Sequence, residues 1–192
     1  LRWRGDHLGF GASAFVTDFE DFIYLAPTTD VIDGLDVYQF SQQGARFHGG
    51  EIYGDWSVPE GPLSADWTFD GSIDYVKAEL DSGQNVPFIP PLTLNAGAKA
   101  NWGMFDIGGD LTIAADQDDA GEGELTTDGY TLVNLSAGID LGKAGLPVEG
   151  VRAFVDIRNV TDEEIRLATS VLRDVAPLPG RNVRAGIRYT FG

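Results

Sequence analysis

The longest run of side chains that could bind a metal ion is acidic, and it contains no basic residue across positions 116–124. Carboxylate oxygens suit hard cations such as Ca²⁺. A solvated loop, kept mobile by the repulsion of its own charges, explains the same composition and is the more common outcome. The candidate cation-binding residues are Asp116, Asp118, Asp119, Glu122 and Glu124.

Three arginines lie within or beside a second polar stretch, residues 161–180. Arg166, Arg173 and Arg181 could contact an anionic ligand, because guanidinium groups form strong hydrogen bonds with carboxylates. Ion pairs with acidic residues of the same stretch are the simpler interpretation. The sequence thus predicts either a substrate-binding contact or a set of internal ion pairs.

Composition excludes several kinds of chemistry. The 192 residues contain no Cys and only two His, which excludes disulfides, thiolate metal sites and cysteine nucleophiles. Lys and Arg number 13 against 30 Asp and Glu, so the net charge is −17. Such a field repels phosphate, and we expect no nucleic-acid partner. No grouping of nucleophile, base and orienting residue is visible, so we predict no enzymatic activity and no cofactor.

The elements that must position these side chains are β-strands, because apolar and polar residues alternate with period two along most of the chain. In the last segment Val183, Ala185 and Ile187 share one face, whereas Arg184 and Arg188 share the other. Strands are predicted over residues 8–16, 22–26, 36–58, 63–75, 92–102, 105–115, 133–141, 151–158 and 181–191.

The connections alternate in length between these strands. Short ones are predicted at 17–21, 59–62, 103–104 and 142–150, and long ones at 27–35, 81–89, 116–129 and 161–180. Tight turns on one side and long loops on the other are typical of outer-membrane barrels, whose strands need about 10 residues to cross the bilayer. Aromatic residues near the short turns would form an interfacial girdle. The predicted fold class is an all-β, antiparallel up-and-down transmembrane β-barrel.

A soluble or surface β-sandwich that binds a ligand or calcium is the alternative, because sandwich strands also have one apolar and one polar face. The two differ in what covers the apolar face: acyl chains in the barrel, a second sheet in the sandwich. In a barrel the charges must face the lumen, since a charge facing mid-bilayer lipid costs about 2–4 kcal/mol.

Strand parity predicts that the barrel is partial. Single-chain barrels usually have an even number of strands, and nine are predicted here. Because the last strand ends on the short-turn side, an odd number of strands places Leu1 on the long-loop side, where a complete barrel would not normally begin. We therefore expect residues 1–192 to form the C-terminal portion of a larger barrel.

Several segments resemble TonB-dependent outer-membrane receptors. Residues 43–51 are similar to the family's small–aromatic–x–Gly–x–Glu strand, and residues 128–135 to the point where a long loop re-enters the barrel. The C-terminal block is the most specific part, although Gly192 follows the aromatic residue on which the family commonly ends. Its motif residues are Asn159, Asp162, Pro177, Pro179, Gly180, Arg181 and Phe191.

The resemblance implies a 22-stranded barrel filled by an N-terminal plug. Such receptors take up scarce solutes, most often metal chelates, with energy delivered by TonB. The present chain would supply about nine C-terminal strands, and the plug and the TonB-contacting segment would lie upstream. Expected partners are outer-membrane lipid, the plug, TonB and the solute, in the outer membrane of a Gram-negative cell. Most charges of the polar face would pack against the plug.

The stretch from Leu172 to Arg181 also resembles receptors of the zinc-uptake branch. That branch tends to carry His-rich outer loops, whereas this chain has only His7 and His48. The sequence therefore leaves siderophores, haem and zinc as alternatives for the transported solute.

Overall fold

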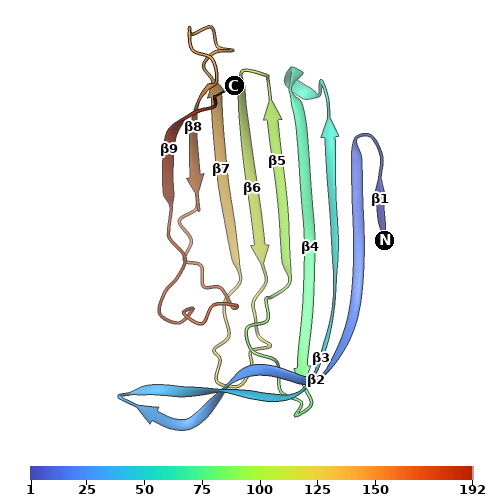
Figure 1. Ribbon diagram of the computed structural model, residues 1–192, viewed down its shortest axis with the longest axis vertical. Coiled ribbons are helices and arrows are strands. Elements are labelled where there is room, and N and C mark those ends of the chain that lie inside the picture. The colour runs from blue at the N-terminus through green and yellow to red at the C-terminus, as the bar shows by residue number, and fades with distance from the viewer. Residues whose placement is uncertain (192) are drawn as a thin grey trace.

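The computed structural model describes residues 1–191 as one antiparallel sheet (Figure 1). Its nine strands lie side by side in sequence order, which confirms the predicted up-and-down topology. One short 3-10 turn, η1 (Pro62–Ser64), precedes β4, and no helix among these residues has the length and apolar character needed to cross a membrane. The strands are β1 (Arg2–Arg4), β2 (Leu8–Ile32), β3 (Leu35–Val58), β4 (Asp66–Leu80), β5 (Thr93–Asn101), β6 (Phe105–Ala114), β7 (Tyr130–Asp140), β8 (Val151–Arg158) and β9 (Asn182–Tyr189).

The strand register keeps the apolar side chains on one face of the whole sheet. Directly opposed residues of antiparallel strands point to the same side, so an unbroken row of partners defines a face. The alternate residues, which include most of the charged ones, form the other side; we call the two sides the apolar face and the polar face. Asp18, Arg46, Lys77 and Glu79 are charged residues that lie in the rows of the apolar face. One apolar row crosses from β2 to β9 through Leu8, Trp56, Phe69, Ala98, Gly109, Leu135, Ile157 and Val183.

No second layer of protein covers the apolar face within residues 1–191, since all nine strands belong to a single sheet. Ile52 is 61% exposed and Ile187 is 73% exposed. A sandwich would have buried these side chains against a second sheet. The sandwich alternative is therefore wrong for this chain.

Aromatic rings pair at the end of the sheet where the short turns lie. Trp102 and Phe105 flank the turn between β5 and β6, with ring centroids 4.6 Å apart. Together these rings form the cluster expected of an interfacial girdle. The other pairs at this end are Trp3 with Phe10, Trp56 with Phe69, Trp67 with Phe69, and Tyr189 with Phe191.

The predicted turn at residues 17–21 and the separate strand at 22–26 are wrong, because β2 runs unbroken through both. The register shifts between Phe19 and Phe22, so that two residues of β2 oppose one residue of β3. Such a β-bulge bends a strand without ending it. The strand count stays at nine because β1, which the alternation did not predict, adds one.

The predicted long loop at 27–35 is also wrong, since β2 and β3 continue as a hairpin to the pair Ile32 and Leu35. Asp33 and Gly34 form the turn with φ values of 53° and 81°. A two-residue turn with both φ values positive is the type I′ turn that Asp-Gly favours. β4 begins at Asp66 rather than at the predicted residue 63, because Leu63 and Ser64 adopt left-handed φ values of 62° and 56°.

The β2–β3 hairpin crosses the long-loop end of the sheet (Figure 1). The Tyr38 hydroxyl donates a 3.0 Å hydrogen bond to the Gly123 carbonyl, in the connection between β6 and β7. A small apolar core anchors the base of the hairpin. Its buried members are Ala45, Ala78, Leu80 and Val86, and Phe22, Tyr24, Phe47 and Ile89 pack against them.

Candidate functional site

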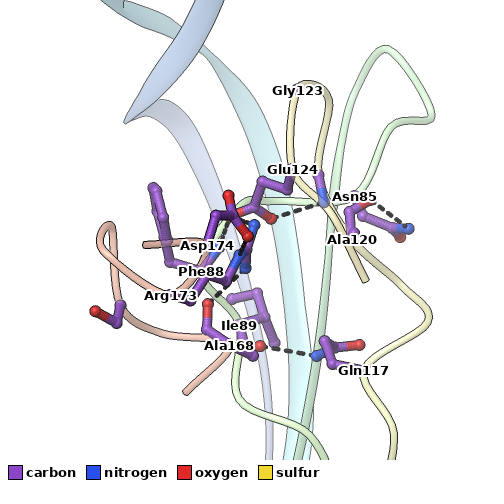
Figure 2. Close-up of polar contacts among 12 residues, drawn as sticks. Asn85, Phe88, Ile89, Gln117, Ala120, Gly123, Glu124, Ala168, Arg173 and Asp174 are labelled. Carbon is purple, nitrogen blue, oxygen red and sulfur yellow. Dashed lines mark hydrogen bonds and ion pairs between the residues drawn. The ribbon is translucent and has the colours of Figure 1, made fainter. Parts of the chain in front are cut away.

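Three long connections meet at this end of the sheet: residues 81–92, 115–129 and 159–181. Figure 2 shows the polar contacts that join them. At the centre, Arg173 Nη2 lies 3.1 Å from Glu124 Oε1, and the two side chains are only 5% and 6% exposed. This buried ion pair links the second connection to the third.

Glu124 also reaches the first connection. Its Oε1 accepts a 3.0 Å hydrogen bond from the Phe88 backbone N–H, and its Oε2 accepts one of 2.8 Å from Gly121 N–H. One carboxylate thus holds backbone or side-chain donors of all three connections. Hydrogen bonds to a charged group in a water-poor setting are stronger than neutral ones.

Arg173 is held on its other sides as well. Its Nη1 donates a 2.7 Å hydrogen bond to the Ala168 carbonyl, and the guanidinium lies 5.8 Å from the centre of the Phe88 ring. Arg166 in turn donates from Nη1 to the Arg173 carbonyl, at 2.5 Å. The guanidinium of Arg173 is therefore enclosed by protein groups.

Neutral side chains add further links between the first two connections. Gln84 Nε2 donates to Glu122 Oε2 at 2.9 Å. Gln117 Nε2 donates to the Ile89 carbonyl at 2.7 Å (Figure 2). We call residues 81–92, 115–129 and 159–181, joined in this way, the loop cluster. The three connections form one packed body instead of three independent loops.

The predicted substrate-binding arginines all have partners within the protein. Arg166 Nη2 lies 2.9 Å from Glu164 Oε1, and Arg181 Nη2 lies 3.5 Å from Asp162 Oδ2. Both partners belong to the same connection, as the simpler interpretation expects. The partner of Arg173 is Glu124, 49 positions away in sequence, and no local pattern indicates that pairing.

The acidic side chains of residues 116–124 contact several different groups of the protein. Asp116 Oδ1 accepts a 2.7 Å hydrogen bond from Gly129 N–H, and Asp119 Oδ2 lies 3.3 Å from Lys77 Nζ. Within residues 1–191, no three Asp, Glu or His side chains group closely enough to hold a metal ion. Protein donors therefore hold these acidic side chains, an arrangement that the composition of the run did not indicate.

A calcium site in this run stays a prediction with a direct check. If it exists, replacing Asp118→Asn together with Asp119→Asn weakens calcium binding, because each substitution removes an anionic oxygen ligand. Calorimetric titration of calcium into the receptor and into the double variant measures this. Equal heats and affinities in both proteins would remove the site.

The C-terminal motif residues build the base of the third connection. Asn159 is 2% exposed and has a left-handed φ of 50°. Its Oδ1 accepts from Glu163 N–H at 3.0 Å, and its Nδ2 donates to the Glu163 carbonyl at 2.8 Å. Asp162 Oδ1 accepts from Arg181 N–H at 2.7 Å, and a Cβ on Gly180 would lie 2.8 Å from that same oxygen. The motif therefore has a structural role that the sequence alone did not show.

The remaining motif positions lie around this base. Nδ2 of Asn159 donates a second hydrogen bond, of 3.4 Å, to the Pro179 carbonyl, and Pro177 lies exposed just before it. The Phe191 ring lies 4.7 Å from that of Tyr189 at the end of β9. Gly192 lies outside the described residues.

Asn159→Ala is expected to lower the free energy of unfolding of the loop base by about 2–3 kcal/mol. The change leaves partly buried backbone groups of Glu163 without partners, and Ala is disfavoured at a positive φ. Hydrogen exchange at residues 160–181 should accelerate accordingly. Thr161→Ala is the matched control, because the Thr161 hydroxyl makes only a 3.5 Å hydrogen bond to Asn159 Oδ1. Equal exchange in both variants would contradict the role assigned to Asn159.

Charges on the polar face pair across the strands. Arg152 Nη1 lies 2.6 Å from Asp106 Oδ1, and Lys99 Nζ lies 3.8 Å from Asp106 Oδ2. Arg184 Nη2 lies 2.6 Å from Asp156 Oδ2. These ion pairs lie within the polar face itself.

An antiparallel wall with a continuous apolar face, a charged face, tight turns at one end and packed loops at the other defines part of an outer-membrane β-barrel. The family model described as "TonB dependent receptor-like, beta-barrel" matches residues 1–160. The chain belongs to this family of TonB-dependent receptors. Its members are transport proteins of the outer membrane and not enzymes, which confirms the predicted localisation and the predicted lack of enzymatic activity.

Solved structures share the fold. The copper transporter OprC superimposes with a TM-score of 0.80 at 20% identity, and the siderophore receptor PirA from Acinetobacter baumannii with a TM-score of 0.65 at 15% identity. Each comparison covers 99% of this chain and 30% of the other chain, so the chain spans about a third of their length. No curated protein sequence matches the chain.

Proposed function

We propose that the protein containing this chain takes up a metal chelate across the outer membrane, with energy delivered through TonB. Membership of the receptor family over residues 1–160 carries this proposal. On this proposal residues 1–192 are the C-terminal portion of a 22-stranded barrel, and a plug domain fills its lumen. The polar face lines the lumen, and the loop cluster lies at the outer entrance.

The chemistry of the cargo is proposed from the loop cluster. Arg166 and Arg181 keep 37% and 53% of their side chains exposed, whereas Arg173 is enclosed. Exposed guanidinium groups at the entrance suit the carboxylate groups of an anionic chelate. One of the two similar structures is a copper transporter and the other is a siderophore receptor, so the similarity does not distinguish between metals. A siderophore, haem or zinc chelate fits this proposal.

A deletion strain of the source bacterium tests the proposal. Uptake of radiolabelled iron–siderophore, haem, copper and zinc chelates is measured with and without a protonophore. We expect the deletion to abolish uptake of one class, a plasmid copy to restore it, and the protonophore to abolish it again. Unchanged uptake of all four, or uptake that survives collapse of the proton gradient, would contradict the proposal.

The two exposed arginines have their own test. Replacing Arg166→Ala together with Arg181→Ala is expected to raise the half-saturating chelate concentration about tenfold or more, because each hydrogen bond to a charged group contributes about 1.5–3 kcal/mol. Lys at both positions keeps the charge and should retain most of the affinity. Arg2→Ala, in β1 at the far edge of the sheet, is the matched control.

A further inference from the structure

A recess opens on the polar face at the long-loop end of β7, β8 and β9, next to the third connection. Its volume of about 460 Å³ falls in the range of about 300–1,000 Å³ that is common for small-molecule sites. The strands supply mainly polar side chains to it, and the third connection supplies mainly apolar ones. The recess is therefore large enough for part of an organic ligand, and its two sides differ in chemistry.

The polar side of the recess carries an excess positive charge. Arg184 Nη2 lies 2.6 Å from Asp156 Oδ2, so these two charges balance each other. Arg158 also lines the recess and opposes Asn182 in the register, but it has no ion pair within residues 1–191. One guanidinium group therefore stays uncompensated here, in a chain whose net charge is −17. A carboxylate is the partner that best matches the fork of donors on an arginine.

The other side of the recess is apolar. Ile165, Leu178 and Pro179 of the third connection line it, together with Leu132 of β7. Ile165 is buried, whereas Leu178 is 36% exposed and can still lose contact with water when a ligand binds. An inorganic anion would leave these side chains without a partner. Sites for organic ligands combine such an apolar lining with a few polar groups that fix the orientation of the ligand.

Hydrogen bonds within the protein hold the third connection in place beside the recess. The Leu178 N–H donates to the Ile165 carbonyl at 2.8 Å, and Asn159 Nδ2 donates to the Pro179 carbonyl at 3.4 Å. The Asn159 N–H donates to Asn134 Oδ1 at 3.1 Å, which ties the connection to β7. A site whose walls are already ordered loses less conformational entropy when a ligand binds. The recess is therefore formed before a ligand enters it.

We propose that this recess binds the organic part of the transported chelate and selects an anionic chelator that carries a carboxylate beside an apolar group. The carboxylate pairs with Arg158, and the apolar group packs against Leu178 and Pro179. This inference rests on the proposed function, which supplies the cargo. A cationic chelator is disfavoured, because it would place a second positive charge next to the guanidinium group of Arg158.

Calorimetric titration of the full receptor with three iron chelates tests the class of ligand. Ferric citrate carries carboxylates alone, iron protoporphyrin carries carboxylates on an apolar ring, and ferrioxamine B is a cationic hydroxamate chelate. We expect at least one of the two carboxylate chelates to bind and ferrioxamine B not to bind. Binding of ferrioxamine B would overturn the inference and leave the proposed function standing, as would binding of none of the three by a receptor that still transports a chelate. A receptor that neither binds nor transports any chelate would fail both.

Variants of Arg158 test the residue itself. Arg158→Ala breaks no ion pair within residues 1–191, so the barrel should still form. We expect it to raise the dissociation constant of the carboxylate chelate about tenfold or more, because a hydrogen bond to a charged group is lost. Arg158→Lys keeps the charge and should retain most of the affinity. Arg188→Ala is the matched control, because Arg188 lies on the same face of β9 but outside the recess. Equal affinity in Arg158→Ala and the wild type would overturn the inference.

Thiol labelling tests whether the chelate occupies the recess. Residues 1–192 contain no Cys, so Asn182→Cys places one thiol in the recess of a receptor otherwise free of Cys. With the carboxylate chelate at about ten times its dissociation constant, labelling by a maleimide should slow about tenfold, because only the unliganded receptor reacts. Val175→Cys is the control, since Val175 lies in the same connection, is 77% exposed and does not line the recess. A position 182 that is unreactive without ligand, or equally reactive with it, would overturn the inference.

Discussion

Arg173→Ala is expected to release the loop cluster, at a cost of about 3–5 kcal/mol in local stability. The substitution leaves the Glu124 carboxylate buried without its cation, and removing one partner of a buried ion pair carries a penalty of this size. It also removes the donor to the Ala168 carbonyl. The strands themselves should persist, because their hydrogen bonds do not depend on the loops. Hydrogen exchange over residues 81–92, 115–129 and 159–181 measures the release.

Two further variants isolate the buried pair. Arg181→Ala removes an arginine of the same connection from a pair that is half exposed, so its cost should be at most about 1 kcal/mol. Combining Arg173→Met with Glu124→Gln removes both charges and should recover much of the loss, since replacing a buried pair by neutral groups is often tolerated. Equal rates of hydrogen exchange in the Arg173→Ala and Arg181→Ala variants would show that the buried pair of Arg173 and Glu124 does not stabilise the loop cluster.

Leu135→Lys is expected to destabilise the barrel in a bilayer by about 2–4 kcal/mol. Leu135 occupies the centre of β7 on the apolar face and is 45% exposed. A lysine there would face acyl chains near mid-membrane, where this cost applies. Chemical denaturation of the receptor in phospholipid vesicles gives the free energy of unfolding directly.

Ser136→Lys is the matched control because its side chain points to the other face of the same strand. Ser136 opposes Asp156 of β8, so an added ammonium group gains an acidic neighbour across the strands. Its effect should be within about 1 kcal/mol of the wild type. If the two lysine variants were equally stable in vesicles, the apolar face would not be in contact with lipid.

Alternation of side chains predicted the faces of this sheet correctly, because a strand has a side-chain period of two that any reader of the sequence can count. Where polar residues gathered in β2, the same reasoning placed a turn at 17–21 that the structure replaces with a bulge. The composition indicates that the strand is disturbed, but only the pairing that resumes between Phe22 and Gln43 of β3 shows that the strand continues. The type I′ turn at Asp33 and Gly34, in contrast, had a local signal.

The C-terminal block shows the limit of motif reading. Its residues are recognisable in the sequence, yet their task follows from geometry: Asn159 and Asp162 hold both ends of the third connection through hydrogen bonds that span up to 20 positions. The arginines of the same connection suggested an anionic ligand or local acids. The partner of Arg166 is Glu164, two positions away and therefore always within reach, whereas Arg181 meets Asp162, 19 positions away, because the two ends of the connection come together.

The sequence by itself determined that this chain is a sheet with one apolar and one charged side and that the connections after β3 alternate between short and long. Both properties are local, since they depend on spacing along a single strand or connection. The tertiary structure alone decided that Glu124 meets Arg173, that the hairpin crosses the loops, and that Asp106 meets Arg152 on the polar face. These features depend on which strands become neighbours and how the loops pack, and distances between residues far apart in the chain are fixed only when the whole sheet has formed.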